Sequence, residues 1–137
     1  MQALFCLHSN IGGVKMKEKI ILIVEDEEYM KKVVQYNLER KNYKVLSVST
    51  GKEALKEAKD KELSLILLDL MLPDIDGFKV CEKLKGNKKT KDIPIIIVTA
   101  LGEDVNYERA KELGVSEYVT KPFSLKDLLG RIERILK

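Results

Sequence analysis

The chain has 137 residues, 45% of them hydrophobic and 34% charged, and its formal net charge is +3. This length suits one domain with one core, and the composition is that of an ordinary globular protein. Subtracting Lys15 and Lys17, the only charged residues among the first 17, leaves +1 for residues 18–137. Such a small excess does not indicate a strongly basic face, so we expect no direct nucleic-acid binding by this chain.

The rarer residue types exclude further classes of protein. Cys6 and Cys81 are the only cysteines, which is typical of a reduced, cytoplasmic protein. His8 is the only histidine and precedes the regular part of the chain, which excludes histidine-based catalysis and a histidine-rich metal site in the core. No apolar run has the length of a transmembrane helix, so we expect no membrane association.

Two regions differ in pattern. Residues 1–17 contain no acid and no regular hydrophobic period, and we expect either a flexible tail or an extension upstream of a second start at Met16. From Lys19 onwards, short aliphatic runs alternate with amphipathic segments, which indicates a single domain over residues 18–137. The expected strands are 19–24, 43–48, 65–69, 93–98 and 118–120, and the expected helices are 28–40, 50–58, 77–85, 103–113 and 124–136.

This alternation of strand and helix predicts βαβ units, and therefore a parallel sheet covered by helices on both faces. The expected fold class is α/β, a flavodoxin-like (βα)5 three-layer sandwich with a central five-stranded parallel sheet. Thr50 with Glu53 forms a capping box, and Ser124 is the expected cap of the last helix.

Polar residues stand where four of these strands end. Glu25 and Asp26 follow the first strand and Asp69 ends the third, while Thr99 follows the fourth and Lys121 the fifth. Because the carboxyl ends of parallel strands share one edge of a sheet, we expect these side chains to converge.

Converging carboxylates repel one another unless they are protonated, paired with a base or bound to a cation. Oxygen ligands without cysteine or histidine favour a hard cation such as Mg²⁺, or alternatively Mn²⁺ or Ca²⁺. An ammonium and a hydroxyl beside them suit phosphoryl transfer, in which a carboxylate attacks phosphorus. The residues by themselves therefore predict a Mg²⁺-dependent phosphoryl site.

Four motifs in order give the chain a resemblance to a known family. They are Val-Glu-Asp at 24–26, Leu-Leu-Asp-Leu-Met-Leu-Pro-Asp-Ile-Asp-Gly at 67–77, Val-Thr-Ala at 98–100 and Tyr-Val-Thr-Lys-Pro-Phe at 118–123. With these motifs, residues 19–137 resemble a response-regulator receiver domain of two-component signal transduction. The resemblance implies a phosphorylation-activated switch whose partner is a sensor histidine kinase or a histidine phosphotransfer protein.

The resemblance also implies roles for single residues. Asp69 is the implied phosphoacceptor for a phosphoryl group from a phosphohistidine. Asp26, Asp69 and the backbone carbonyl of Met71 are the implied Mg²⁺ ligands, with Glu25 acting partly through water. Glu25 stands where the family commonly has an aspartate, so its side chain is longer by one methylene and the resemblance does not fix its exact contact.

Further implied roles concern the switch itself. Thr99 binds the phosphoryl group and moves toward it, Lys121 pairs with a phosphoryl oxygen, and the Lys121–Pro122 peptide is expected to be cis. Tyr118 turns inward behind Thr99, which converts a local change of charge into a change of surface.

Two residues flanking the phosphoryl group, Met71 and Leu101, cannot orient an attacking water, and we therefore expect slow self-dephosphorylation. Asp74 and Asp76 are expected to shape the turn before the third helix.

The expected output surface is made by the fourth helix, the fifth strand and the last helix. There, Glu117 and Arg131 match residues that pair across symmetric dimers in the winged-helix class of response regulators. Tyr107 and Asp127 stand where that class commonly has a basic–acidic pair, so the sequence predicts at most a weak homodimer on phosphorylation.

Two rival interpretations stay open at this level. A haloacid-dehalogenase-like phosphatase also has a strand-end aspartate and Mg²⁺, but it requires a second acid two residues later, where this chain has Met71. A non-phosphorylated pseudo-receiver acting as an interaction module would not need the acids, Thr99 and Lys121. We expect a switch that promotes its own phosphorylation and dephosphorylation but turns over no separate substrate, either as a stand-alone receiver or as part of a longer regulator.

Overall fold

The computed structural model describes residues 10–11, 14–15 and 18–137. Strands β1 (Asn10–Ile11) and β2 (Val14–Lys15) pair with each other antiparallel, apart from the main sheet. The expected flexible tail or upstream extension otherwise falls outside the described residues.

The main sheet has five parallel strands in the order β4-β3-β5-β6-β7. The strands are β3 (Ile20–Val24), β4 (Lys44–Val48), β5 (Leu65–Leu68), β6 (Ile95–Thr99) and β7 (Glu117–Thr120). The chain runs outward from β3 to the edge strand β4 and then crosses back to β5. The order of connection therefore reverses between β3 and β5, and such a reversal point is where open α/β sheets form a crevice.

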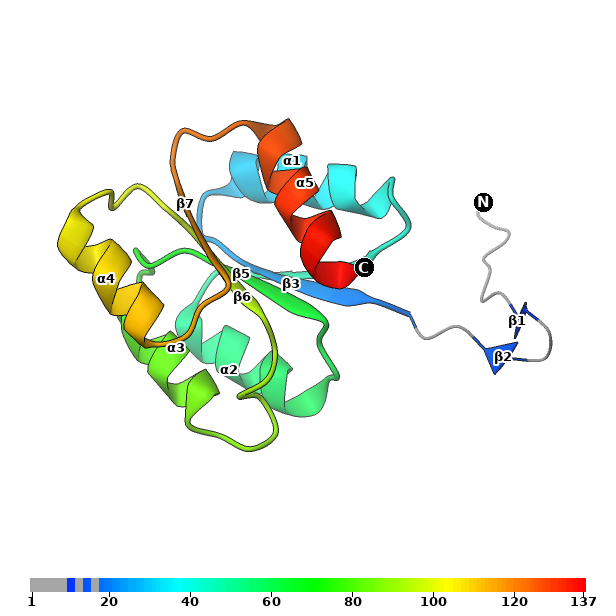
Figure 1. Ribbon diagram of the computed structural model, residues 1–137, viewed down its shortest axis with the longest axis horizontal. Helices are drawn as coiled ribbons and strands as arrows, with labels where there is room; N and C mark the ends of the chain where they lie inside the picture. Colours follow the sequence, from blue (N-terminus) through cyan, green and yellow to red (C-terminus); the bar gives the residue numbers. More distant parts are fainter. Residues whose placement is uncertain (1–9, 12–13, 16–17) are drawn as a thin grey trace.

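Helices cover both faces of this sheet, so the expected three-layer α/β fold is confirmed. One face carries α1 (Glu28–Glu39) and α5 (Leu125–Leu136). The other face carries α2 (Gly51–Asp60), α3 (Gly77–Lys85) and α4 (Asp104–Glu112), as Figure 1 shows. Among the described residues, no helix has the length and apolarity needed to span a membrane.

Strands β5 and β6 lie inside the sheet with helices on both of its faces, and their sequences reflect this. Every residue of β5 and β6 is buried. Their aliphatic side chains alternate between two hydrophobic cores, one on each face of the sheet. Burial of each such side chain contributes about 1.5–3 kcal/mol. This explains why both strands read as continuous apolar runs rather than as alternating ones.

Helix starts agree with the caps expected from the sequence. The Thr50 hydroxyl accepts the Glu53 N–H at 3.1 Å, and the Ser124 hydroxyl accepts the Asp127 N–H at 3.2 Å. The Glu53 carboxylate in turn accepts the Thr50 hydroxyl at 3.0 Å and the N–H of Ser49, the residue before the cap, at 3.2 Å.

The fourth expected strand, 93–98, begins and ends later than expected. Pro94 lacks the N–H that a central strand requires, and the strand starts at Ile95 and runs to Thr99. The Pro94 carbonyl still accepts the Ile66 N–H at 3.0 Å, so the proline flanks the ladder instead of interrupting it.

Helix α4 is attached to the rest of the domain more thinly than the other helices. Ala110 is its one buried residue. The guanidinium of Arg109 lies 4.2 Å from the centre of the Phe78 ring and 3.4 Å from a carboxylate oxygen of Glu82, both on α3. Arg109 therefore links α4 to α3 through one cation–π contact and one ion pair.

Candidate functional site

The register of the sheet brings two acids together. Val24 and Leu68 are paired residues of β3 and β5, and the Asp69 N–H donates to the Val24 carbonyl at 3.1 Å. Glu25 and Asp69, the next residues of each strand, therefore leave the sheet side by side. Both are buried, with exposed fractions of 2% and 5%.

A third acid completes the cluster. Asp26 is exposed, and it offers a carboxylate oxygen that lies within 4.8 Å of one oxygen each from Glu25 and Asp69. These three acids are the ones that the sequence placed at the strand ends.

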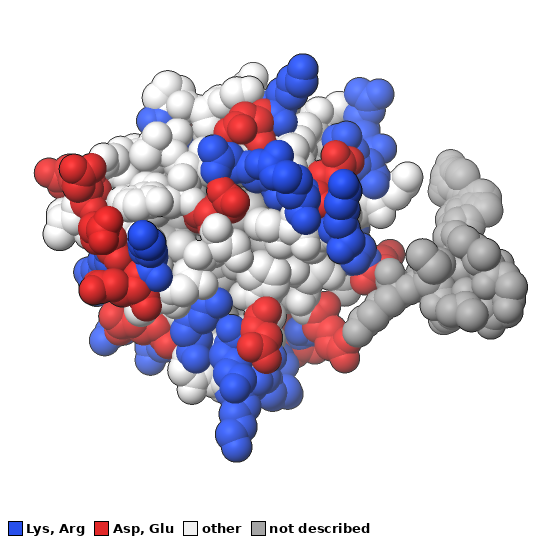
Figure 2. Space-filling model, in the orientation of Figure 1, with Lys and Arg blue, Asp and Glu red and all other residues white. Residues whose placement is uncertain are grey.

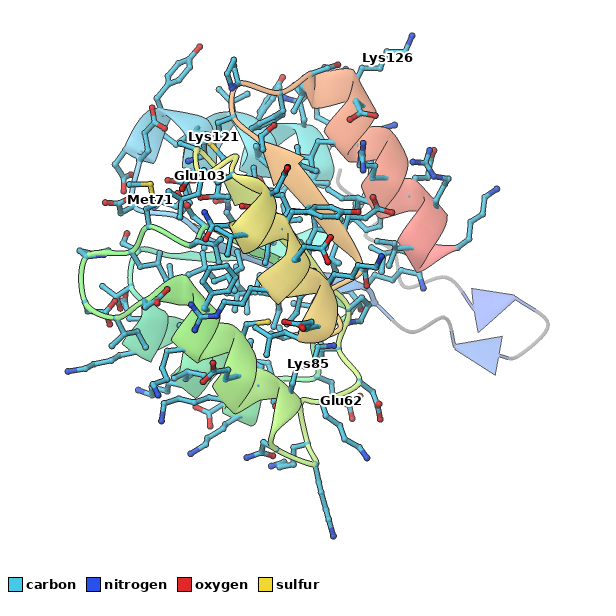
Figure 3. The ribbon with its side chains drawn as sticks, turned by 60° about the vertical axis from the view of Figure 1, so that its left-hand side comes forward. Glu62, Met71, Lys85, Glu103, Lys121 and Lys126 are labelled. Carbon is cyan, nitrogen blue, oxygen red and sulfur yellow. The ribbon has the colours of Figure 1, made fainter. Side chains whose placement is uncertain are left out.

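Lys121 follows β7 and reaches across the sheet edge to this cluster. Its Nζ lies 2.8 Å from Glu25 Oε1 and 2.9 Å from Asp69 Oδ2. Figure 3 shows Lys121 at the same end of the molecule as Met71, whereas Lys85 and Glu62 lie at the opposite end. The Lys121–Pro122 peptide is cis, as expected.

The charges in the cluster shift the acid–base properties of two groups. Burial raises the pKa of Glu25, against the opposing effects of its hydrogen bonds from Lys121 and from the Glu27 N–H. Burial also tends to lower the pKa of Lys121, but its bonds to Glu25 and Asp69 and their charges outweigh that effect and raise it. Lys121 is therefore held as an ammonium.

Both buried carboxylates are fixed by backbone groups as well. The Met71 N–H donates to Asp69 Oδ1 at 3.0 Å, and the Glu27 N–H donates to Glu25 Oε2 at 3.0 Å. Each carboxylate thus has one oxygen held by the following loop and the other by Lys121.

The donor set fits a divalent cation. Three acids and one lysine carry a formal charge of −2 in a partly buried cluster. Oxygen ligands of this kind match the preference of Mg²⁺, and a doubly charged cation balances the cluster.

Thr99 and Tyr118 lie beyond Asp69 along the sheet. Thr99 is fully buried at the end of β6, and its Oγ1 accepts the Leu101 N–H at 3.4 Å, near the upper limit for such a bond. The half-buried Tyr118 donates its hydroxyl to the Leu101 carbonyl, and its ring meets that of Tyr107 edge-on at 5.8 Å. Both residues therefore contact the segment that follows β6.

Asp74 makes contacts beyond its expected role in the turn. Asp76 starts α3, where its carboxylate accepts the Phe78 N–H at 2.9 Å. Asp74 also reaches α2, where Oδ1 accepts the Gly51 N–H at 2.8 Å and Oδ2 accepts the Lys52 N–H at 2.9 Å. No local pattern signals this contact, because donor and acceptor are more than 20 residues apart.

Lys31 is a second residue that the sequence reasoning missed. It is buried on the same face of α1 as Val34 and Leu38, three and seven residues later. Its Nζ lies 2.7 Å from Ser49 Oγ and 2.8 Å from Glu28 Oε2. It therefore joins α1 to the segment between β4 and α2.

On the α4-β7-α5 face, Arg131 forms ion pairs within the chain. Its guanidinium contacts Glu117 on β7, and its Nε lies 3.0 Å from Asp127 Oδ2 on α5. The two residues expected to pair across a dimer are thus partners of each other in the single chain.

A parallel α/β sheet whose carboxyl edge holds clustered acids, a lysine and a buried threonine defines a class of protein: an α/β domain suited to phosphoryl chemistry with a divalent cation. The family model of the response regulator receiver domain matches residues 21–133. The chain therefore belongs to the response regulator receiver domains of two-component signalling, which confirms the resemblance inferred from the motifs.

Curated relatives include the alkaline phosphatase synthesis transcriptional regulatory protein PhoP of Bacillus subtilis. It is 44% identical over 119 residues, which make up 87% of this chain and 49% of that protein. The chain spans about half the length of the curated relatives it matches.

Solved structures show the same fold. The non-phosphorylated HemR receiver domain of Leptospira biflexa is 37% identical, with a TM-score of 0.81 over 88% of this chain and 95% of that one. The receiver domain of sensor histidine kinase PA1611 from Pseudomonas aeruginosa, solved with a magnesium ion coordinated in its active-site cleft, is 28% identical. Its TM-score is 0.79 over 88% of this chain and 98% of that one.

Proposed function

We propose that Asp69 accepts a phosphoryl group from a phosphohistidine of a sensor histidine kinase or a histidine phosphotransfer protein. An Asp69 oxygen forms a bond to phosphorus while the phosphorus–nitrogen bond breaks, and the histidine nitrogen keeps the electron pair and takes up a proton. The observation that carries this proposal is the buried Asp69 carboxylate, held between the Met71 N–H and the Lys121 ammonium beside two further acids.

Mg²⁺ is the proposed cofactor. Asp26, Asp69 and the backbone carbonyl of Met71 would hold it, with Glu25 acting partly through water. When bound, it supplies positive charge that offsets the charge of the phosphoryl oxygens. The clustered carboxylates and the magnesium in the cleft of the PA1611 receiver domain support this assignment.

Lys121 and Thr99 complete the proposed phosphoryl site. The Lys121 ammonium already reaches Asp69 and would pair with an oxygen of the phosphoryl group attached there. The Thr99 hydroxyl, held only at 3.4 Å by Leu101, would move to donate to another oxygen. Tyr118 would then leave its bond to the Leu101 carbonyl and turn inward, which changes the α4-β7-α5 face.

We propose that this face carries the output. It would form a weak homodimer on phosphorylation, in which Glu117 and Arg131 exchange their present intrachain bond for one across the interface. The chain would work in the cytoplasm, promoting its own phosphorylation and dephosphorylation without turning over a separate substrate. No observation favours the phosphatase, whose required second acid is replaced by Met71, a side chain that is 54% exposed.

The experiment is intact-mass analysis after incubation with Mg²⁺ and acetyl phosphate. The wild-type protein is expected to gain one phosphoryl group, and Asp69→Asn or the omission of Mg²⁺ is expected to abolish the gain. An unchanged gain in Asp69→Asn would place the phosphoryl group elsewhere. No gain with any small phosphodonor would leave a pseudo-receiver as the better account, and turnover of a generic phosphate ester would support the phosphatase.

A further inference from the structure

The loop between Asp69 and Gly77 is fastened at both ends by its own neighbours. At its start, the Met71 N–H holds Asp69 Oδ1, and at its end the Gly77 N–H donates to the Leu70 carbonyl at 3.0 Å. A β-carbon at Gly77 would lie 2.4 Å from Leu70 Cα, so the two ends of the loop touch and only glycine fits there. Residues 72–76, between these two fastened points, form the middle of the loop.

That middle part rests on the N-terminus of α2. Both oxygens of Asp74 accept N–H groups of the first turn, from Gly51 and Lys52. A β-carbon at Gly51 would lie 2.5 Å from Ile75 Cγ1, so the residue after Asp74 packs directly against the same turn. The carboxylate and its neighbour thus dock the loop on the helix.

Helix α2 does not need Asp74 as its cap. The Thr50 hydroxyl accepts the Glu53 N–H, and the Glu53 carboxylate accepts the Thr50 hydroxyl and the Ser49 N–H, so the start of the helix has side-chain caps of its own. The Gly51 and Lys52 N–H groups lie in the same first turn and are the ones that Asp74 accepts. Because a carboxylate at a helix N-terminus is favoured by the helix dipole, the contact holds the loop more firmly than a neutral side chain would.

We propose that Asp74 is a positioning residue for the acid cluster, which holds the loop so that the Met71 N–H fixes the orientation of the Asp69 carboxylate. Without this contact, the loop that carries Met71 loses its support on α2, and the Met71 N–H holds Asp69 Oδ1 less firmly, so that Lys121 becomes the main partner of the carboxylate. The Asp69 carboxylate then has to be ordered again each time a divalent cation binds, which weakens the binding. This inference rests on the proposed function, because Asp69 is taken as a metal ligand.

The test compares Asp74→Ala with Thr50→Ala in the whole chain. Thr50→Ala is the matched control, because it removes a cap from the same helix end without touching the loop. Titration calorimetry with Mg²⁺, in the absence of any phosphodonor, gives the dissociation constant of each protein. We expect it to rise roughly 10-fold in Asp74→Ala, as for other groups that orient a metal ligand, and to stay near the wild-type value in Thr50→Ala.

Two more measurements separate positioning from a general loss of structure. The rate of phosphorylation by acetyl phosphate should fall in Asp74→Ala at low Mg²⁺ and recover at saturating Mg²⁺, because a destabilised fold would lower it at both. The Met71 amide should exchange its hydrogen faster in Asp74→Ala than in Thr50→Ala. Asp74→Asn, which keeps one oxygen acceptor, should lie between Asp74→Ala and the wild type, and it replaces Asp74→Ala if that variant does not fold.

An unchanged Mg²⁺ affinity in the Asp74 variants, or an equal loss in Thr50→Ala, would overturn the inference. A wild-type protein that takes up no phosphoryl group would overturn the proposed function instead. In that case the calorimetry and the exchange of the Met71 amide still decide whether Asp74 positions the cluster.

Discussion

The ammonium of Lys121 lies 2.9 Å from Asp69 Oδ2, although the two residues are 52 positions apart in the chain. The same ammonium lies 2.8 Å from Glu25 Oε1, so it bridges two carboxylates that the sheet register places side by side. We expect this arrangement to affect both the stability of the protein and the binding of Mg²⁺ proposed above.

We expect Lys121→Met to destabilise the metal-free protein. The substitution leaves Glu25 and Asp69 without their shared cation, which we expect to lower the free energy of unfolding by about 1–3 kcal/mol. Mg²⁺ should restore part of this loss. Urea unfolding with and without Mg²⁺ measures both effects, and Lys126→Met, an exposed lysine of α5, is the control. Equal losses in the two variants would contradict the expectation.

Glu25→Gln should change how stability depends on pH. Because burial raises the pKa of Glu25 above its ordinary value of 4.5, the folded state holds the proton more tightly than the unfolded chain. Its contribution to stability is therefore complete below pH 4.5 and is lost as the pH rises through the folded pKa. In metal-free buffer, as the pH rises through the folded-state pKa of Glu25, the free energy of unfolding of Glu25→Gln should therefore increase relative to that of the wild type.

Urea unfolding at a series of pH values in the presence of a chelator measures this difference. Glu108→Gln, at an exposed position on α4, should follow the wild-type profile. With Mg²⁺ the sign should reverse, since Glu25 is then a proposed contributor to the metal site. A Glu25→Gln profile parallel to the wild type at every pH would show that Glu25 does not titrate differently on folding.

Met71→Asn should shorten the lifetime of phosphorylated Asp69. The Met71 side chain is largely exposed two residues after Asp69, and its thioether cannot orient an attacking water. An amide can, so we expect the phosphoryl group to be lost roughly 10-fold faster. Intact-mass analysis over time, after removal of the phosphodonor, gives the rate. Met71→Leu should keep the slow decay, and a similar rate in all three proteins would refute the role of this position.

Arg131→Ala should weaken the proposed homodimer while changing the stability of the single chain only slightly. The side chain of Arg131 is 30% exposed, so losing its ion pairs with Glu117 and Asp127 should cost less than about 1 kcal/mol of stability. The proposed dimer needs the same guanidinium and should weaken. Sedimentation velocity before and after phosphorylation measures this, with Arg134→Ala on the exposed side of α5 as the control. Unchanged association in Arg131→Ala would argue against this interface.

Arg109→Met should loosen α4. Ala110 is the one buried residue of this helix, and the contacts of Arg109 with Phe78 and Glu82 join the helix to α3. We expect a loss of about 0.5–1 kcal/mol and faster hydrogen exchange confined to the α4 amides. Lys111→Met, on the same helix, should leave exchange unchanged, and equal exchange in both variants would count against the arginine contact.

The sequence by itself determined the fold and the acids that gather at one edge of the sheet. Short continuous aliphatic runs such as 65–68 and 95–98 favour strands buried on both faces, and their alternation with amphipathic helices indicates a parallel arrangement. Once the strands are parallel, the residues that follow them share one edge. Local rules were also sufficient for the helix caps at Thr50 and Ser124, since donor and acceptor lie within one turn.

Only the tertiary structure decided which partners these residues take. The sharing of Lys121 between Glu25 and Asp69 depends on how three strand ends and a loop meet. The reach of Asp74 to α2 and the burial of Lys31 against Ser49 depend on how separate elements pack. Hydrophobic periodicity specifies which face of an element is buried, but it does not encode which polar group of a distant element will lie within hydrogen-bonding distance.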